Sequence, residues 1–370
     1  MHVHVVDPSA FTPPYDHALC SALAAAGAEV DLYTARFAYG EVAEPDGYAR
    51  HELFYRAARR ARRASLRRAV KLAEHVPDML RYARASRTAD VVHFQWLALP
   101  QLDAHLLPSR TAGRPARVLT AHETRPHEPT AGQLSAQRRL YDRFDAVVTH
   151  SEHGRARLVG ELGVAPQRVH VIGHGALSHL AGGEVAPPRF ESSLPVVLFA
   201  GLLRPYKGLD VLLEAWRGLD GAELWIVGMP RMDTAALRAG APPGVRFDER
   251  FISDAELRGY MRRADLVVLP YRTSDQSGIA LTALAFGKPL LVSDVGGLAE
   301  LVAAGAARGV APGDAGALRG ALSELLADRR ALEALADAAL TAAARRYGWD
   351  AIARQTLDLY RSLLGENPAR

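Results

Sequence analysis

The turn FAGLLRPYKG at Phe199–Gly208 combines residue types that could hold a phosphate. Gly201 lets the backbone approach a ligand closely, and Arg204 and Lys207 place two positive charges just before an amphipathic stretch that begins at Leu209. Because the N–H groups and the dipole at a helix amino terminus attract anions, the pattern predicts a diphosphate site. An ordinary turn with solvated charges would show the same residues.

Lysine is scarce in this chain, which makes each lysine informative. Among 45 lysines and arginines, lysine occurs only at Lys71, Lys207 and Lys288. Lysine carries a compact ammonium charge, whereas arginine carries a wide planar guanidinium group. At a site that needs one charge against one phosphate, arginine therefore cannot always replace lysine. We interpret Lys207 as a phosphate ligand and Lys288, on a turn before Pro289, as a surface charge.

A second helix amino terminus is expected within Leu269–Leu301, where a polar loop separates a strand from a helix that begins near Gly278. Ser277 and Gly278 stand at its start, and backbone N–H groups there could reach the same diphosphate from the opposite side. Two helix ends that converge on one diphosphate indicate a nucleotide sugar.

The loop after the expected strand Val118–Ala121 begins with His122 and Glu123. An imidazole there could hydrogen-bond a sugar or an acceptor hydroxyl, and the Glu123 carboxylate could orient the ring or raise its pKa. Both residues are candidates for catalysis, although a lone histidine in a loop is more often structural or solvated.

Three side chains in other loops are candidates for acceptor binding. Tyr15 and His17 follow a pair of prolines, where they would either meet the acceptor or cap the first helix. Trp96, beside Gln95, could form a platform for a sugar, although such an aromatic residue is more often part of the core. His150 ends a later strand, and we favour helix capping as its role.

Short apolar strands alternate with helical segments, which predicts an α/β fold with two doubly wound parallel sheets. The expected strands are Val3–Val6, Val30–Tyr33, Val91–Phe94, Val118–Ala121, Ala146–Thr149, Val169–Ile172, Val196–Ala200, Glu223–Val227, Val245–Phe247, Leu266–Leu269 and Leu290–Ser293. From Asp314 to Leu364 only helices are expected, with a break near 347–349.

The segment 173–195 is rich in Gly, Pro and Ser and has no sustained apolar period, so it separates two domains. We assign residues 1–178 to an amino-terminal Rossmann-like domain, 179–195 to a linker and 196–348 to a second Rossmann-like domain. Residues 349–370 form a C-terminal helix for which a return to the first domain is one option.

Composition excludes several classes of protein. A net charge of +4 is too small to indicate nucleic acid as a partner. The single cysteine, Cys20, excludes an internal disulfide and a cysteine metal cluster and suits a reducing cytoplasm. No apolar run approaches the about 20 residues that span a bilayer, and the amino terminus begins on strand-like alternation. We expect a soluble, cytoplasmic protein without a signal peptide.

The stretch Arg56–His75 predicts a basic amphipathic helix, because cations recur at steps of three and four residues from Arg56 to Lys71. Such a face could rest on anionic lipid headgroups, which would make the protein peripheral to the membrane. The other face of this helix is mostly alanine. An equal alternative to membrane contact is therefore that this face packs on the sheet while the cations lie in solvent.

The segments FAGLLRPYKGLDVLLEAW and QSGIALTALAFGKPLLVSDVGGLAE resemble the retaining GT-B glycosyltransferases of family 4. The resemblance implies two Rossmann-like domains that face each other across a cleft, with the acceptor bound by the amino-terminal half and the nucleotide-sugar donor by the carboxy-terminal half. It is dense from Val196 to Leu301 and weaker before Ala146, so donor binding is better supported than the choice of acceptor.

By this resemblance Lys207 binds the donor phosphates, and His122 matches the family's active-site histidine. The family's usual arginine falls on Leu202, so Arg204 would reach the phosphates from one helical turn away. The implied donor-binding residues are Gly201, Arg204, Lys207, Arg250, Phe251, Ser277, Gly278, Ile279 and Thr282.

This sequence departs from the family at a pair of glutamates, which fall on Ser274 and Thr282. Thr282 could keep one hydrogen bond to a ribose hydroxyl where a carboxylate accepts two, and Asp275 or Gln276 could replace the first glutamate. Because of this departure, the resemblance does not identify the donor sugar.

The function that the resemblance implies is transfer of a hexose from a nucleotide sugar to a hydroxyl of a glycan, a lipid-linked sugar or a small metabolite, with retention. We expect no metal and no other cofactor, because there is no Asp-x-Asp motif and two helix ends with two cations can neutralise a leaving diphosphate. A protein that binds nucleotide or glycan without transfer, and a sugar-nucleotide epimerase, are the alternatives.

Overall fold

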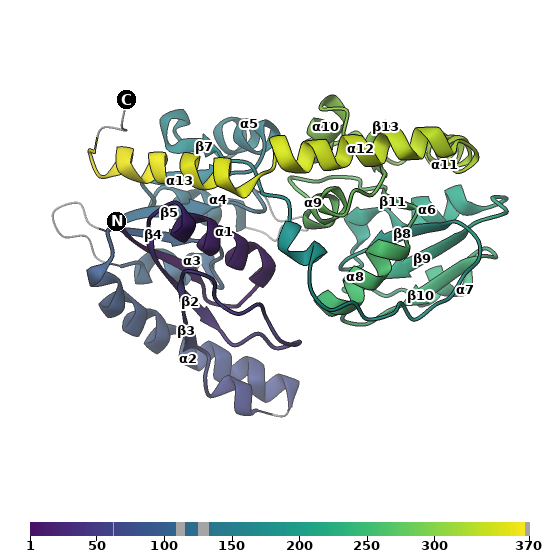
Figure 1. Cartoon of the computed structure of the whole chain (residues 1–370). Helices are drawn as coiled ribbons and strands as arrows, with labels where there is room; N and C mark the ends of the chain where they lie inside the picture. Colours follow the sequence, from purple (N-terminus) through teal and green to yellow (C-terminus); the bar gives the residue numbers. More distant parts are fainter. Residues whose placement is uncertain (62, 109–114, 125–132, 367–370) are drawn as a thin grey trace. The chain divides into compact units, whose positions relative to one another are not determined.

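The computed structural model describes residues 1–61, 63–108, 115–124 and 133–366, and the chain divides into two compact units (Figure 1). Unit 1 comprises Met1–Gly173 and Trp349–Arg370, and unit 2 comprises His174–Gly348. The segment that we expected to be a linker belongs to unit 2, where the Arg258 guanidinium donates hydrogen bonds to the carbonyls of Leu180 and Glu184 at 2.8 and 3.0 Å.

Unit 1 is built on a seven-stranded sheet in the order β3-β2-β1-β4-β5-β6-β7, and every neighbouring pair is parallel. The strand order reverses between β1 and β4, and ligands of such sheets bind beyond the carboxyl ends at this switch point. The strands are β1 (His2–Asp7), β2 (Glu29–Ala35), β3 (Ala49–Phe54), β4 (Val91–Phe94), β5 (Ala116–Thr120), β6 (Ala146–Thr149) and β7 (Val169–Val171).

Helices cover both faces of this sheet. Val3 and Val5 pack with α1 (Pro13–Ala25) and α13 (Trp349–Leu363), whereas Val6 packs on the opposite face with residues of α2 (Ala64–Ala85). The remaining helices are α3 (Pro100–Leu106), α4 (Gln133–Tyr141) and α5 (Glu152–Gly160), with short 3-10 turns η1 (Ala58–Arg60), η2 (Ser86–Thr88) and η3 (Pro166–Arg168). The C-terminal helix α13, yellow in Figure 1, lies beside α1 within unit 1.

The basic helix that we expected from Arg56 to His75 was wrong in its extent. The helix α2 begins at Ala64 and continues through Pro77 to Ala85, while residues 58–60 form a separate 3-10 turn. Arg56 and Arg60 therefore lie outside α2, so the cations from 56 to 71 do not form one helical face.

Unit 2 is built on a six-stranded parallel sheet in the order β10-β9-β8-β11-β12-β13, which reverses between β8 and β11. The strands are β8 (Val196–Ala200), β9 (Glu223–Val227), β10 (Val245–Asp248), β11 (Leu266–Leu269), β12 (Leu290–Ser293) and β13 (Arg308–Val310). The helices and turns are η4 (Ser178–Ala181), η5 (Pro205–Lys207), α6 (Leu209–Trp216), α7 (Ala235–Ala239), α8 (Asp254–Arg263), α9 (Gly278–Ala285), α10 (Gly296–Ala303), α11 (Ala315–Ala327) and α12 (Arg329–Arg345).

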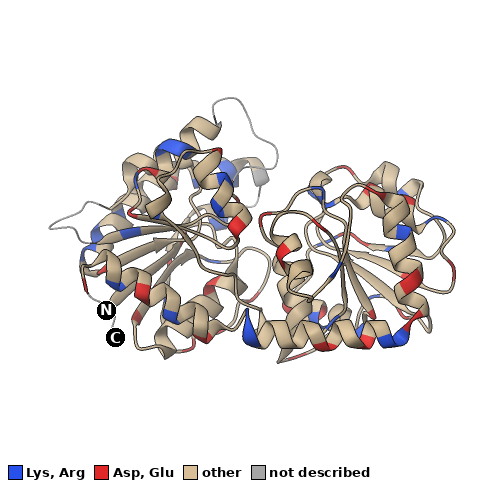
Figure 2. Ribbon diagram, turned by 90° about the horizontal axis from the view of Figure 1, so that it is seen from above, with Lys and Arg blue, Asp and Glu red and all other residues tan. Residues whose placement is uncertain are grey.

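The expectation of two doubly wound parallel sheets is confirmed. Two strands were missed: β3, an edge strand with charged residues on it, and β13, which has three residues. Figure 2 shows cations and anions interspersed over the ribbon of both units. Within the described residues, the helices are all too short or too polar to cross a membrane.

Candidate active site

The predicted phosphate turn lies at the switch point of unit 2, between β8 and α6. Gly201 directly follows β8 with φ at 108°, and Gly208, before α6, has φ at 67°. A side chain at Gly208 would place its Cβ 2.0 Å from the carbonyl oxygen of Pro270, in the loop after β11. Glycine at this position therefore lets the two loops of the switch point touch through their backbones.

Arg272 joins the same two loops. Its backbone N–H donates to the carbonyl of Tyr206 at 2.7 Å, and its guanidinium forms two hydrogen bonds with the Asp210 carboxylate in the first turn of α6. The hydrogen bond from Arg272 holds the pKa of Asp210 below its usual value. Because this ion pair is half exposed, it adds little to the unfolding free energy, and its main effect is to fix the positions of the two loops.

Lys207 and the first turn of α9 meet at Gly201. A Cβ added to Gly201 would lie 2.9 Å from Lys207 Nζ and 3.1 Å from Ile279 Cγ1, so the absence of a side chain makes room for both. Lys207 is buried, and its ammonium lies 5.1 Å from the centre of the Tyr271 ring. The structure thus brings the cation and the second helix end together.

The amino terminus of α9 has two N–H groups available to a ligand. Ser277 caps the helix, because its Oγ accepts from the N–H of Ala280 at 3.2 Å. The N–H groups of Gly278 and Ile279 have no acceptor among the residues that the structure describes. Thr282 donates its hydroxyl proton to the Gly278 carbonyl at 2.8 Å and is buried, so this proton is used inside the helix instead of at a ribose.

The remaining donor-binding candidates divide into two groups. The Arg204 guanidinium makes no hydrogen bond or ion pair within the described chain, so it is available to an anion. Arg250, before Phe251, instead binds the carboxylates of Asp248 and Glu256 at 3.0 and 2.6 Å. The hydrogen bond from Arg250 lowers the pKa of Glu256 to about 2, which indicates a structural ion pair at the start of α8.

Ser274 and Asp275 occupy the loop where the family has a glutamate, and both are buried. The Ser274 hydroxyl has no hydrogen-bond partner in the described part of the chain. A buried polar group without a partner is costly, and a ligand hydroxyl would remove that cost.

In unit 1 the candidates gather around His122 at the carboxyl ends of β4, β5 and β6. The His122 ring stacks on Trp96, with ring centres 4.9 Å apart and planes 9° from parallel, and contacts Tyr15 edge-on at 4.8 Å. Trp96 is in turn held by a hydrogen bond from Nε1 to Thr12 Oγ1 at 3.0 Å and by Phe11 at 4.5 Å. Aromatic neighbours therefore fix the plane of the imidazole.

The hydrogen bonds of His150 determine which nitrogen of His122 carries a fixed proton. His150 Nδ1 lies 3.0 Å from the Ile172 carbonyl, which can only accept, so this nitrogen is protonated. Burial lowers the pKa of His150 to about 4, so its ring is neutral at pH 7 and its Nε2 accepts. His122 Nδ1, 3.1 Å away, must therefore donate.

Nε2 of His122 faces the Gln95 side-chain amide at 3.2 Å. The amide nitrogen of Gln95 is buried and has no partner among the described residues. With its carbonyl toward the ring, the amide accepts from an imidazolium; turned over, it donates to a neutral ring. At 3.2 Å this contact is long, so a substrate hydroxyl could replace it.

Gln95 and His150 thus orient His122. The orienting role that we expected of Glu123 stays a prediction. Tyr15 is 4% exposed and supports the His122 ring from the interior. His17 lies two residues further along α1 on another face and hydrogen-bonds Tyr48 at 3.1 Å. The sequence drew attention to Gln95 and His150 but not to their contacts with His122, because only the fold brings these three residues together.

A pair of buried carboxyls, Asp7 and Asp16, holds the loop after β1. Asp7 accepts hydrogen bonds from the backbone N–H groups of Ser9, Phe11 and Thr12, and the Asp16 carboxyl hydrogen-bonds to Asp7. Burial raises the pKa of both carboxyls, and the neighbouring charge of Asp7 raises that of Asp16 further. Because three N–H groups stabilise the charge of Asp7, Asp16 carries the shared proton.

A basic cavity of about 900 Å³ adjoins this loop, between the ends of β2 and β3 and the start of α2. The cations Arg36, Arg60 and Arg67 line it and have no ion-pair partner among the residues that the structure describes. Lys71 also lines it and donates to Ser9 Oγ at 3.2 Å. The full set of its charged residues is Arg36, Glu41, Arg50, Glu52, Arg56, Arg59, Arg60, Arg67 and Lys71.

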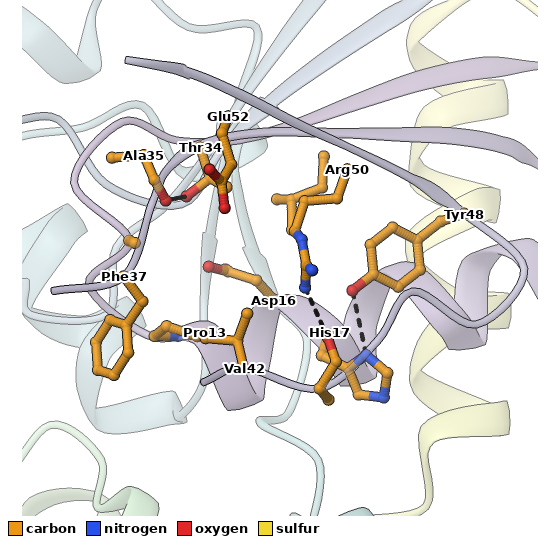
Figure 3. Close-up of a pocket in the computed structure, with 13 residues that line it drawn as sticks. Pro13, Asp16, His17, Thr34, Ala35, Phe37, Val42, Tyr48, Arg50 and Glu52 are labelled. Carbon is orange, nitrogen blue, oxygen red and sulfur yellow. Dashed lines mark hydrogen bonds between the residues drawn. The ribbon is translucent and has the colours of Figure 1, made fainter. Parts of the chain in front are cut away.

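A smaller cavity of about 20 Å³ lies next to the basic one, and Ala35, Phe37, Arg50 and Glu52 line both. Figure 3 shows Asp16 and His17 of α1 on one side of it and Arg50 of β3 on the other. It is large enough for about one water-sized group, so the larger cavity is the one that could take a ligand.

Two Rossmann-like parallel sheets, one of them with a lysine and two helix ends at its switch point, define the architecture of GT-B glycosyltransferases. Residues 194–328 match the family of glycosyl transferases group 1, and residues 15–176 match glycosyltransferase family 4. The chain belongs to glycosyltransferase family 4.

Relatives and solved structures agree with this assignment. D-inositol 3-phosphate glycosyltransferase 2 of Catenulispora acidiphila is 30% identical over 289 residues, which cover 72% of this chain and 67% of that protein. A D-inositol 3-phosphate glycosyltransferase of Streptomyces bingchenggensis is 28% identical over 293 residues, covering 72% and 64%.

Among solved structures, sucrose-phosphate synthase from Thermosynechococcus elongatus is similar in fold, with a TM-score of 0.75, 20% identity and 99% of each chain covered. Anabaena HepE in complex with UDP-glucose has a TM-score of 0.70 and 18% identity, with 98% of this chain and 100% of that chain covered. At these identities the similarity concerns the fold.

Proposed function

We propose that this chain transfers a hexose from a nucleoside diphosphate sugar to a hydroxyl of an anionic acceptor, with retention and without a catalytic metal. The observation that carries the proposal is the meeting of Lys207 with the amino terminus of α9 at Gly201. The ammonium group and the N–H groups of Gly278 and Ile279 would neutralise the charge that develops on the leaving diphosphate. Arg204 supplies a second cation.

In the proposed reaction the bond between the anomeric carbon and the diphosphate oxygen breaks, and a bond from the same carbon to the acceptor oxygen forms. The proton of the acceptor hydroxyl passes to the leaving phosphate on the same face of the sugar, which retains the configuration. His122 would hydrogen-bond a substrate hydroxyl through Nε2 in exchange for Gln95, since His150 keeps Nδ1 protonated.

The basic cavity of unit 1 supports an anionic acceptor. The guanidinium groups of Arg36, Arg60 and Arg67, which have no ion-pair partner in the described chain, line it, and guanidinium binds phosphate through two parallel hydrogen bonds. Relatives of this chain are named for D-inositol 3-phosphate, so this compound is the first acceptor to test.

The donor site is tested by nucleotide binding. We expect one or more of UDP, GDP, ADP and TDP to raise the melting temperature, and Lys207→Ala to weaken the affinity about 10- to 100-fold, as loss of a hydrogen bond to a charged group predicts. Lys288→Ala is the matched control, because Lys288 binds the carbonyls of Arg262 and Ala264 at 3.0 and 2.9 Å, away from the turn. Absence of stabilisation by all four nucleotides would contradict the donor site.

Turnover then separates transfer from the alternatives. A transferase releases nucleoside diphosphate slowly until acceptor is added, and NMR of the product gives its anomeric configuration. An epimerase interconverts nucleotide sugars without acceptor, and a binding protein does neither. Turnover that persists at full rate with a chelator present is expected for the metal-independent reaction.

The acceptor site is tested with D-inositol 3-phosphate against unphosphorylated inositol. Arg67→Gln should raise the KM for the phosphorylated acceptor about tenfold or more and leave the donor KM unchanged. Arg84→Gln, an exposed arginine of the same helix outside the cavity, is the control. Equal use of both inositols, or equal effects of the two variants, would refute an anionic acceptor in this cavity.

Contact of α2 with an anionic membrane surface is a further part of the proposed function. Its support is the exposure of Leu66 and Leu72, 53% and 60%, beside exposed arginines of the same helix. The protein should sediment together with vesicles that contain anionic lipid. A smaller fraction of the double variant with Leu66→Ser and Leu72→Ser should sediment with them. Leu340→Ser, at a 50% exposed position of unit 2, is the control, and equal sedimentation of all three proteins would refute this contact.

A further inference from the structure

Four side chains with metal-binding atoms meet on one face of β1, β2 and β3. His2 and His4 project from the same face of β1, and Asp31 of β2 is paired with His4 in the sheet register. Asp31 Oδ2 lies 2.8 Å from His2 Nε2 and 3.6 Å from His4 Nε2, and its other oxygen lies 2.8 Å from His51 Nε2 of β3. The ligand atoms of His2, His4 and Asp31 all lie within 4.8 Å of one another.

The hydrogen bonds of His2 place its Nε2 atom against a carboxylate oxygen. Nδ1 of His2 lies 3.1 Å from the Thr88 carbonyl, which only accepts, so this nitrogen carries a proton. In the neutral ring Nε2 is then a lone pair, and it faces a carboxylate oxygen at 2.8 Å. Two lone pairs at this distance repel, so the contact needs either a proton on Nε2 or a metal cation that both atoms share. A metal-binding histidine commonly has this arrangement, with its other N–H on a backbone carbonyl.

His4 supplies an independent observation. Its side chain is fully buried, and neither ring nitrogen has a hydrogen-bond partner in the described part of the chain. A neutral imidazole always carries one N–H, so an unpartnered buried ring loses free energy. Nε2 is the ring atom that faces Asp31, so the same cation would give the lone pair of His4 a partner.

We propose that His2 Nε2, His4 Nε2 and Asp31 Oδ2 bind a divalent transition metal, with Zn²⁺ the best match. Two imidazoles and one carboxylate form a ligand set that Zn²⁺ takes with bonds of about 2.0–2.2 Å, which separates tetrahedral ligand atoms by about 3.3 Å. The separations of 2.8 and 3.6 Å from Asp31 bracket this value. The fourth position is left to water, and His51 orients the carboxylate through its second oxygen.

The metal site is separate from the proposed transfer reaction. His2 begins β1, and the loop of Asp7 that adjoins the acceptor cavity follows the other end of this strand, about 17 Å away at the usual rise of an extended chain. The metal would tie β1 to β2 and, through His51, to the edge strand β3. Its effect is therefore expected on the stability of unit 1 and not on donor turnover.

The test uses the full chain without a histidine tag, stripped of metal and titrated with Zn²⁺ by calorimetry and with Co²⁺ by visible absorption. We expect one ion per chain and the d–d absorption of four-coordinate Co²⁺. At about one hundred times the Kd, Zn²⁺ should raise the melting temperature by roughly 5–10 °C.

Single substitutions identify the ligands. His2→Gln and Asp31→Asn should each weaken binding at least tenfold, and His51→Gln by about 10- to 100-fold, the usual effect of losing a residue that orients a ligand. His105→Gln, at an exposed histidine of the same unit, should change nothing. Circular dichroism confirms that each variant is folded, and nucleotide binding reports separately on unit 2.

Three results would overturn the proposal: failure of the wild-type chain to bind Zn²⁺ at millimolar concentration, undiminished binding in His2→Gln and Asp31→Asn, or equal loss in His105→Gln. In the first case the cluster is an ordinary ion pair between protonated histidine and Asp31. None of these results bears on the sugar-transfer proposal, which rests on other residues.

Discussion

Substitution of Gly208 by alanine tests whether contact between the two loops of unit 2 creates the donor site. The substitution has two costs. A φ of 67° strains any residue with a Cβ, by about 1–2 kcal/mol. The Cβ would also lie 2.0 Å from the Pro270 oxygen, whereas real Cβ contacts hardly ever fall below 3.0 Å, so the loops must separate by about 1 Å.

The control for the first cost is Gly218→Ala. Gly218 has φ at 78°, and a Cβ there meets nothing within 4 Å, so this variant has the backbone strain without the clash. We expect Gly218→Ala to lose about 1–2 kcal/mol of unfolding free energy and Gly208→Ala a further 1–3 kcal/mol, the usual range for overpacking. Urea unfolding measures both.

The two variants should differ more in nucleotide affinity and transfer rate than in unfolding free energy. Because Gly208 follows Lys207, a shift of about 1 Å separates the ammonium from α9, and a displacement of that size can reduce activity about 100-fold. Nucleotide affinity and transfer rate are measured below the melting temperature of each variant. If Gly208→Ala binds nucleotide as tightly as Gly218→Ala does, contact between the two loops does not create the donor site.

Three further predictions concern unit 1. Asp16 has a raised pKa in the folded state, so the folded chain binds the proton more tightly than the unfolded chain, and stability falls as pH rises from the unfolded pKa to the folded one. Asp16→Asn should remove this fall, which amounts to about 1.4 kcal/mol for each unit by which the pKa of Asp16 is raised. If the unfolding free energy changes by the same amount between pH 5 and pH 8 in the wild type and in Asp16→Asn, the prediction is contradicted. Tyr360→Phe should cost about 1–3 kcal/mol, because the tyrosine hydroxyl lies 2.6 Å from His93 Nδ1 in the core; thermal unfolding with no change would show that this hydrogen bond adds nothing. His150→Phe should lower kcat and leave the KM for nucleotide sugar unchanged, because His122 loses the acceptor that holds its Nδ1 proton; an unchanged kcat and pH profile would refute this positioning role.

Most of the fold could be predicted because a parallel strand covered on both faces is a continuous apolar run. The run VVLFA coincides with β8, and LVVL coincides with β11. The strand β3 was missed because it lies at the edge of its sheet, where ARHELF carries charges that face solvent. The start of α2 was missed because the arginines before Ala64 continue the helical spacing without a helix.

The positions of the candidate donor-site residues were largely predictable, because these residues lie in short segments that directly follow strands. The sequence placed Lys207 and Ser277 each at a helix start, and the switch point of the sheet brings these two starts together. The role of Thr282 was not predictable, since its hydrogen bond to the Gly278 carbonyl depends on the side-chain rotamer.

The sequence by itself determined two parallel α/β sheets, the family and the turn at Phe199–Gly208, because each depends on patterns within about 20 residues of chain. Only the tertiary structure decided what surrounds His122, which buried carboxyl carries a proton and which histidines share Asp31. His2 and His4 look like ordinary strand alternation in the sequence, and their partner is 27 or more residues away. Protonation and metal binding depend on distances of a few ångströms between strands, and those distances are set only when the sheet forms.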